Sequence, residues 1–127
     1  MWLYKQSTGE LFAGAEEGVS IGVLAGTGYA GFGAGKNNPE LEAVHLLGPL
    51  PKGLYRFGSP EASPKLGPLA IPLIPDDSNE MFGRSAFFLH ADSITHPGEA
   101  SEGCIVMARD VRQRVFASAD KDLRVIA

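Results

Sequence analysis

Glycine and proline interrupt the apolar runs of this chain along its whole length, and this punctuation most strongly limits what it can fold into. The sequence holds 16 glycines and 9 prolines among 127 residues. Short apolar runs separated by such turn-forming residues are typical of many short strands joined by turns. The pattern therefore predicts a mainly β domain.

The expected strands follow from the apolar runs between these breaks. Residues 2–6 and 10–14 flank Ser-Thr-Gly and predict a hairpin. Residues 18–26 predict a strand with Val19, Ile21 and Val23 on one side. Residues 66–75 carry three prolines, so we expect an edge strand or an extended segment, because proline cannot donate to a sheet ladder. Further strands are expected at 54–57, 85–90 and 122–127, with loops over 26–39 and 91–100.

One helix is expected after the cysteine, within residues 108–120. Val111 and Val115 recur at helical spacing, and Asp110 lies where a helix N-terminus favours a carboxylate. The arginines of this segment are expected on a solvated face: Arg109, Arg112 and Arg114.

Length, charge and cysteine content exclude several classes of protein. A chain of 127 residues without repeat or linker predicts one domain over residues 1–127. The single cysteine excludes an internal disulfide and a thiolate zinc cluster, so we expect neither metal nor cofactor. A net charge of -4 without a basic run argues against nucleic acid and anionic membranes as partners.

The N-terminus and the apolar runs bear on localisation. No run approaches the roughly 20 apolar residues that span a bilayer. The first residues lack the basic start and apolar stretch of a Sec signal peptide. We expect a protein made in the cytoplasm that reaches any other compartment by another route.

The glycine-rich segment at 26–36 resembles nucleotide-binding loops in its residue pattern but not in the sequence around that pattern. Gly-Thr-Gly-Tyr-Ala-Gly is followed by residues that no helix would tolerate, although a dinucleotide fingerprint needs a helix there. Ala30 and Asn37 also occupy positions where a P-loop needs glycine and a hydroxyl. The segment is better interpreted as a mobile loop near a binding cleft.

Cys104 is either a small buried hydrophobe or a nucleophile, and its spacing from His90 alone leaves both interpretations open. His90 ends an apolar strand, and a polar loop leads from it to Cys104, so thiol and imidazole can meet on adjacent strands. Pairing with histidine can lower a thiol pKa, and the N–H groups of Cys104 and Gly103 are candidate oxyanion donors. His96 is a rival base, but its Thr-His-Pro-Gly setting predicts a flexible turn.

Several ordered motifs resemble one enzyme family. Phe-Phe-Leu-His-Ala-Asp followed by Ser-Glu-Gly-Cys is similar to the signature of L,D-transpeptidases. Residues 4–11, 26–42, 48–55 and 83–84 extend the likeness to the Tlde1-type domain of type VI secretion effectors. The resemblance implies an L,D-transpeptidase-like (YkuD-like) fold, a β-sandwich or partly closed barrel with one helix after the catalytic cysteine.

The resemblance also implies an activity and partners. Cys104 matches the family nucleophile, His90 its general base, and Ser101 and Gly103 the flanking motif positions. The implied substrate is a peptidoglycan stem tetrapeptide, whose terminal D-alanine is removed by water or exchanged for another D-amino acid. The implied setting is delivery by a secretion system to a target cell's periplasm, with an immunity protein as partner.

Some positions depart from the family pattern or stay ambiguous. Glu102 stands where many transpeptidases have histidine, and Val106 where they often have arginine, which puts wall-linking transpeptidation in doubt. Arg84 either pairs with a substrate carboxylate through its fork or caps a strand in solvent. Asp92 either orients His90 or starts a turn. Tyr29, Asn37 and Asn38 are candidates for lining the cleft.

Two other functions remain open from the sequence. The domain is alternatively a non-catalytic wall-binding or phage-associated module of the same fold, or a cysteine endopeptidase that cuts peptide cross-bridges. Fast alkylation of Cys104 near neutral pH is expected of a catalytic thiolate and not of an inert buried thiol.

Overall fold

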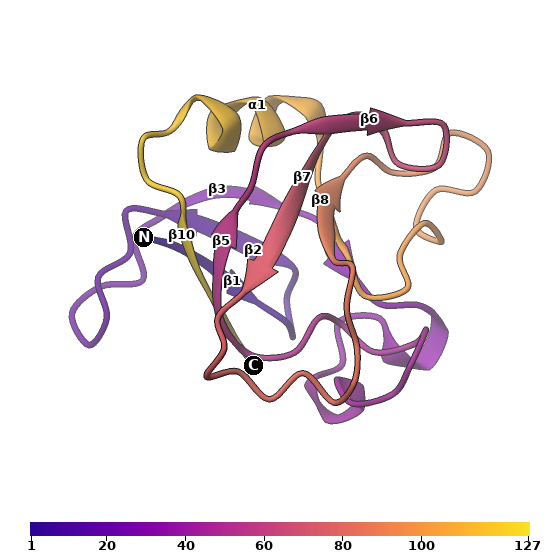
Figure 1. The fold of residues 1–127 in the computed structure, drawn as a ribbon, viewed down its shortest axis with the longest axis horizontal. Coiled ribbons are helices and arrows are strands. Elements are labelled where there is room, and N and C mark those ends of the chain that lie inside the picture. The colour runs from indigo at the N-terminus through magenta and orange to yellow at the C-terminus, as the bar shows by residue number, and fades with distance from the viewer.

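The fold is a mainly β domain with one α-helix (Figure 1), seen in a computed structural model that describes residues 1–127. Two 3-10 turns, η1 (Gly33–Gly35) and η2 (Pro39–Leu41), lie between β4 and β5. The helix is α1 (Arg109–Ala117). The strands are β1 (Trp2–Lys5), β2 (Glu10–Ala13), β3 (Val23–Thr27), β4 (Tyr29–Ala30), β5 (Gly53–Phe57), β6 (Glu61–Ser63), β7 (Gly67–Pro75), β8 (Phe88–His90), β9 (Ile105–Val106) and β10 (Asp122–Ile126).

The strands form one open sheet with the order β3-β2-β1-β10-β5-β7-β8-β9-β4, and β6 pairs with β7 beside this path. Only Gly28 separates β3 from β4 in the sequence, although these strands stand at opposite ends of the order. The sheet therefore curls, but it is not closed into a barrel. The predicted mainly β fold with a single helix after the cysteine is confirmed.

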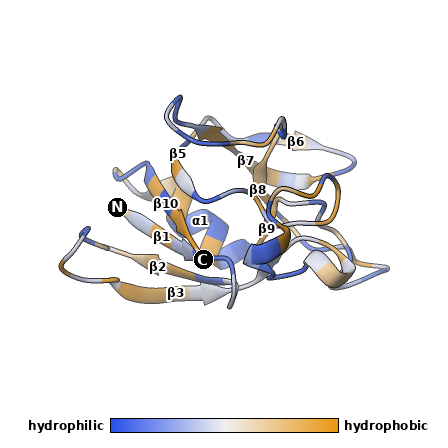
Figure 2. Ribbon diagram, turned by 90° about the horizontal axis from the view of Figure 1, so that it is seen from below, coloured by the Kyte–Doolittle hydropathy of each residue, from blue (hydrophilic) through white to orange (hydrophobic).

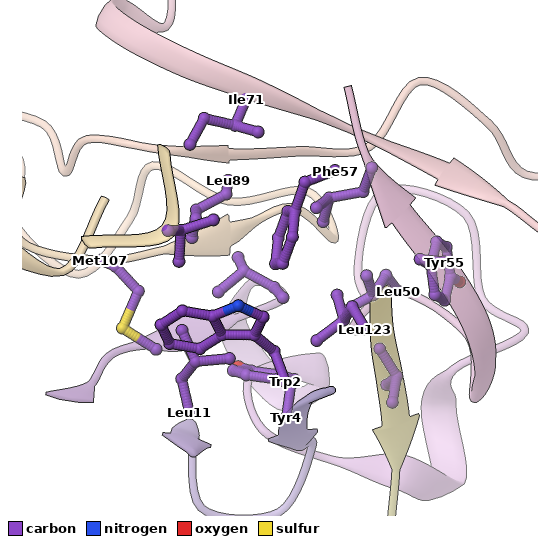
Figure 3. Packing of buried hydrophobic residues seen from close by; sticks show 14 of the residues in the cluster. Trp2, Tyr4, Leu11, Leu50, Tyr55, Phe57, Ile71, Leu89, Met107 and Leu123 are labelled. Atoms are coloured by element: carbon purple, nitrogen blue, oxygen red, sulfur yellow. The ribbon is translucent and has the colours of Figure 1, made fainter. Parts of the chain in front are cut away.

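The core lies where the curled sheet faces itself. Figure 3 shows Trp2 and Leu11 on one side of this core, with Ile71, Phe57 and Leu89 on the other. The ring of Trp2 meets that of Phe57 edge to face, with 6.5 Å between the ring centroids. The same cluster includes Val111 and Val115 of α1, so the helix is fixed by its apolar side.

β7 corrects the expectation of an edge strand at 66–75, because it lies between β5 and β8. Its neighbour on one side changes from β6 to β5 along its length. Pro72 stands at this change, where its carbonyl accepts the Gly58 N–H. A central proline is tolerated there because no continuous ladder needs the missing N–H.

β3 is shorter than the strand expected at 18–26. Gly18 and Gly22 adopt positive φ angles, and residues 16–20 form a turn, so Val19 and Ile21 are exposed instead of sharing a sheet face with Val23. An added Cβ at Gly22 would lie 2.2 Å from the Ala13 carbonyl oxygen. In Figure 2 the orange of hydrophobic residues covers much of β2 and β3.

The helix begins and ends close to its predicted bounds, but the expected solvated arginine face is wrong at one position. Arg112 is 4% exposed, and its guanidinium donates to the carbonyls of Met107, Pro68 and Leu69. This buried arginine joins α1 to β7 and to the segment after β9. No helix of the structure has the length and apolar character needed to cross a membrane.

Candidate active site

His90 ends β8, and Cys104 directly precedes β9, the parallel neighbour of β8. β8 and β9 pair with Leu89 opposite Ile105 and His90 opposite Val106. Continuing this register by one pair of residues places Cys104 beside Phe88, whose N–H donates to Sγ at 3.3 Å. His90 lies two residues further along β8, so the thiol is held against the backbone of the strand that ends at the imidazole.

The hydrogen bond of His90 fixes which ring nitrogen is free. Nδ1 lies 2.7 Å from the carbonyl oxygen of Ala91. A carbonyl only accepts, so Nδ1 carries the proton and Nε2 of the neutral ring keeps its lone pair. Nε2 has no hydrogen-bond partner in the structure and is the nitrogen able to take a proton.

Burial keeps both groups neutral. It lowers the pKa of His90 from its ordinary value of 6.5, and the bond to Ala91 only partly opposes this shift. Burial also raises the pKa of Cys104 from 9.0, against the Phe88 N–H, which lowers it. No hydrogen bond joins Sγ to the imidazole. The site therefore holds a neutral thiol and a neutral imidazole, and not the thiolate that pairing with histidine can produce.

The peptide between Gly103 and Cys104 presents one free donor. The Gly103 carbonyl accepts the Leu50 N–H at 2.9 Å, while the Cys104 N–H on the other side of this peptide bonds to no other residue and points toward its own thiol, whose pKa it lowers. The Gly103 N–H, the second predicted oxyanion donor, is already bonded to Ser101 Oγ at 3.0 Å. The structure thus leaves one of the two expected donors available.

Ser101 holds the turn before the nucleophile together. Its side chain is 1% exposed, and Oγ donates to the Cys104 carbonyl at 2.6 Å. The same oxygen accepts the N–H groups of Gly103 and Gly31, the latter at 2.9 Å. Ser101 is therefore a positioning residue that ties the turn to the end of β4.

Arg84 fits neither role expected from the sequence. It is 5% exposed, and both terminal nitrogens of its guanidinium are occupied by backbone carbonyls. No fork remains for a substrate carboxylate, and the residue does not cap a strand in solvent. The accepting carbonyls belong to Glu42, Gly48 (2.8 Å), Pro49 (2.8 Å) and Glu102 (3.0 Å).

Gly103 is required by its backbone and by its packing. Its φ of +139° is one that L side chains rarely adopt, and an added Cβ would lie 2.6 Å from both Arg84 Nη2 and the Phe87 ring. Glycine at this position therefore lets Arg84 and Phe87 pack against the turn.

Asp92 and Tyr29 fasten the loop between the base and the nucleophile. The Tyr29 hydroxyl donates to Asp92 Oδ1 at 2.7 Å and accepts the Ala100 N–H at 2.9 Å. Asp92 also accepts the N–H groups of Ser93 and Gly98. Asp92 therefore organises the turn and has no hydrogen bond with His90.

The remaining predicted site residues serve turns or face solvent. Asn37 Oδ1 accepts the Ala30 N–H, and Asn38 caps η2 by accepting from the Glu40 N–H. This segment packs closely against residues 47 and 48, unlike the mobile loop expected. Glu102 is exposed and slightly raises the pKa of Cys104. His96 is exposed and bonded to its neighbour Thr95.

Sequence reasoning missed several residues around the site. No sequence pattern identifies Leu50 or Phe88 as site residues, because both act through their backbone N–H groups. The sequence identifies Arg112 and Lys65 as cations but does not show that they act on His90. Burial is the main cause of the lowered pKa of His90, and both charges lower it further.

Two surface hollows lie elsewhere on the molecule. One, of about 300 Å³, lies between the end of β5 and α1, and the other, of about 340 Å³, lies beside residues 15–21. Neither includes Cys104 or His90. No group of three or more histidine, cysteine, aspartate or glutamate side chains is arranged to hold a metal ion.

The comparisons with known proteins point to one family. The family model described as Tlde1 domain matches residues 25–126, which include the whole candidate site. No curated protein and no solved structure matches the chain.

Proposed function

The chain belongs to the Tlde1 domain family, and we propose that it is a peptidoglycan-modifying cysteine enzyme with Cys104 as nucleophile and His90 as general base. Membership suggests a type VI secretion effector. The observation that carries the proposal is the position of Cys104 against β8, where Sγ accepts the Phe88 N–H two residues before His90, whose Nε2 is free.

The proposed reaction starts from a neutral pair. His90 Nε2 takes the thiol proton while Sγ attacks the carbonyl between the third residue and the terminal D-alanine of a stem tetrapeptide. The unpaired Cys104 N–H donates to the oxyanion that forms. The imidazolium then gives its proton to the leaving amine, and D-alanine departs from a thioester on Cys104.

The thioester is resolved by a second nucleophile. His90 Nε2 takes a proton from water or from the amine of another D-amino acid, which attacks the thioester carbonyl. Cys104 leaves as thiolate and recovers the proton from His90. Water gives a tripeptide and therefore L,D-carboxypeptidase activity, whereas an amine gives exchange. Both outcomes remove donor tetrapeptides from cross-linking, which agrees with an antibacterial effector neutralised in kin by an immunity protein.

The raised pKa of Cys104 supports a second candidate, a non-catalytic module of the same fold. A thiol kept neutral by burial is what an inert structural cysteine would show. The two candidates differ in the need for His90 Nε2. A binding module has no use for a free imidazole nitrogen beside the thiol.

The experiment that tests the proposal is mass spectrometry of purified disaccharide tetrapeptides incubated with the protein, with and without glycine or D-methionine. We expect loss or replacement of the terminal D-alanine with wild type and with neither Cys104→Ala nor His90→Gln. Unchanged muropeptides with folded wild-type protein would contradict the proposal and favour the binding module. In a parallel incubation with cross-linked muropeptide dimers, conversion of the dimers to monomers would instead establish an endopeptidase.

A further inference from the structure

We propose that Lys65 is the residue that selects substrates ending in a free carboxylate, by binding the carboxylate of the departing D-amino acid. This inference rests on the proposed function and names a specificity-determining residue for it. Lys65 lies in the turn at residues 64–66, between β6 and β7.

The fold brings this turn to the site. β7 runs antiparallel to β8, with Ile71 opposite Leu89, so the start of β7 lies beside the segment that follows His90. A Cβ placed on Gly67 would be 3.6 Å from the Cβ of Ala91, the residue after His90. In Figure 1 the β6–β7 turn and the loop after β8 lie at the same end of the molecule.

The proposed reaction places the terminal carboxylate of the substrate on the β8 side of the nucleophile. His90 must deliver a proton to the leaving nitrogen, so the leaving group lies toward β8. The carboxylate of a terminal D-amino acid is two bonds from that nitrogen and therefore lies beyond it, away from Cys104. Lys65 precedes β7, His90 ends β8 and Cys104 precedes β9, so the strand order β7-β8-β9 places the element of His90 between the other two.

The other cations near the site are already engaged. Both terminal nitrogens of Arg84 bind backbone carbonyls, and Arg112 binds three more. Lys36 lies over the Tyr29 ring, 4.4 Å from its centroid, on a segment that follows β4 on the far side of β9. Lys65 is exposed and forms neither an ion pair nor a hydrogen bond.

The electrostatics agree with this placement. Burial is the main cause of the pKa shifts of both His90 and Cys104, and the positive charge of Lys65 contributes to each by lowering it. One uncommitted ammonium group therefore acts on both reacting residues, in a chain whose net charge is -4. An anionic substrate end is attracted to this side of the site.

The test compares two substrates that differ only at the C-terminus: a disaccharide tetrapeptide ending in D-alanine and the same compound ending in D-alaninamide. Release of the terminal residue is measured for wild type, Lys65→Gln and Lys65→Arg. Lys5→Gln is the matched control, because it removes the same charge from β1, outside the β7-β8-β9 region.

We expect Lys65→Gln to lower kcat/KM for the carboxylate substrate by about 10- to 100-fold, the loss typical of a charge-assisted hydrogen bond. The amide substrate should be nearly unaffected, Lys65→Arg should keep most of the preference, and Lys5→Gln should resemble wild type. Equal rates for wild type and Lys65→Gln, or an equal loss on both substrates, would overturn the inference while the enzyme stands. No Cys104-dependent release from either substrate would overturn the proposed function and the inference with it.

Discussion

The two halves of the sheet share one apolar core but differ in how many residue pairs join their strands. In the half formed by β1, β10 and β5, four register pairs join each strand to the next, and side chains such as Leu123 and Val125 are buried in the core. In the half formed by β8, β9 and β4, only two pairs join each neighbour. There, buried polar side chains bind backbone atoms.

The geometry of the site depends on buried polar side chains that bond to the backbone. Arg84, Ser101 and Arg112 are each at most 5% exposed, and each joins several backbone groups from separate segments. Such bonds fix the direction of a peptide plane, which apolar contact does not do. We infer that the apolar half supplies stability and the polar half supplies alignment of Cys104.

The largest stability effect is expected in the apolar half. Leu123→Ala should lower the free energy of unfolding by about 2–5 kcal/mol, because this fully buried side chain leaves a cavity in the core. Activity per folded molecule should stay at the wild-type level below the melting transition. Urea denaturation and muropeptide turnover on the same preparation measure both. A matching loss of activity in the folded protein would contradict the division.

Arg84→Met should affect both properties. Removing the guanidinium leaves buried carbonyls without donors, which we expect to cost about 3 kcal/mol of unfolding free energy. The turn before Cys104 also loses the anchor on Glu102, so turnover should fall even where the variant is folded. Arg84→Lys keeps the charge without the fork and should recover little. A stability loss below about 1 kcal/mol would show that these carbonyls are satisfied by water.

Ser101→Ala should separate the two halves most cleanly. Loss of the hydroxyl should cost only about 1–2 kcal/mol of stability. We expect kcat to fall about 10- to 100-fold, because the Cys104 backbone is no longer fixed. Ser118→Ala is the control, since its hydroxyl also accepts a backbone N–H, at a position after α1. Equal kcat values for the two variants would remove the positioning role.

The smallest effect is expected from pH. Burial lowers the pKa of His90 below 6.5, so the native state resists protonation that the unfolded chain accepts. This contribution to stability is complete above about pH 6.5 and is lost as pH falls through the folded-state pKa. His90→Gln should weaken this acid dependence in urea titrations.

The raised pKa of Cys104 predicts slow alkylation of the thiol by iodoacetamide at pH 7, with a rate that rises above pH 9. Fast alkylation at pH 6 would indicate a thiolate instead.

The sequence was informative about the apolar half. The first hairpin, the strand at 122–127 and the helix follow from hydrophobic spacing, and the structure has all three. The spacing misled at Val19 and Ile21, because positive φ angles at Gly18 and Gly22 turn the chain there. It also misled at β7, since nothing local reveals that a central strand changes partners at Pro72.

The polar half was less predictable for a physical reason. Arginine is usually exposed, so no local pattern marks Arg84 or Arg112 as buried. Their partners are backbone carbonyls, which every residue carries, and the contacts join segments that are distant in the sequence. Cys104, His90 and Ser101 were selected by motif, while the donors and anchors around them required the fold.

The central claim, that Cys104 carries the acyl group, is tested most directly by intact-protein mass spectrometry. The protein is mixed with a disaccharide tetrapeptide, quenched in acid within the first turnovers and weighed. We expect an added mass equal to that of the muropeptide without its terminal D-alanine. The adduct should be located on the peptide that contains Cys104 and should be absent in Cys104→Ala. Release of D-alanine without such an adduct, or by Cys104→Ala, would contradict it.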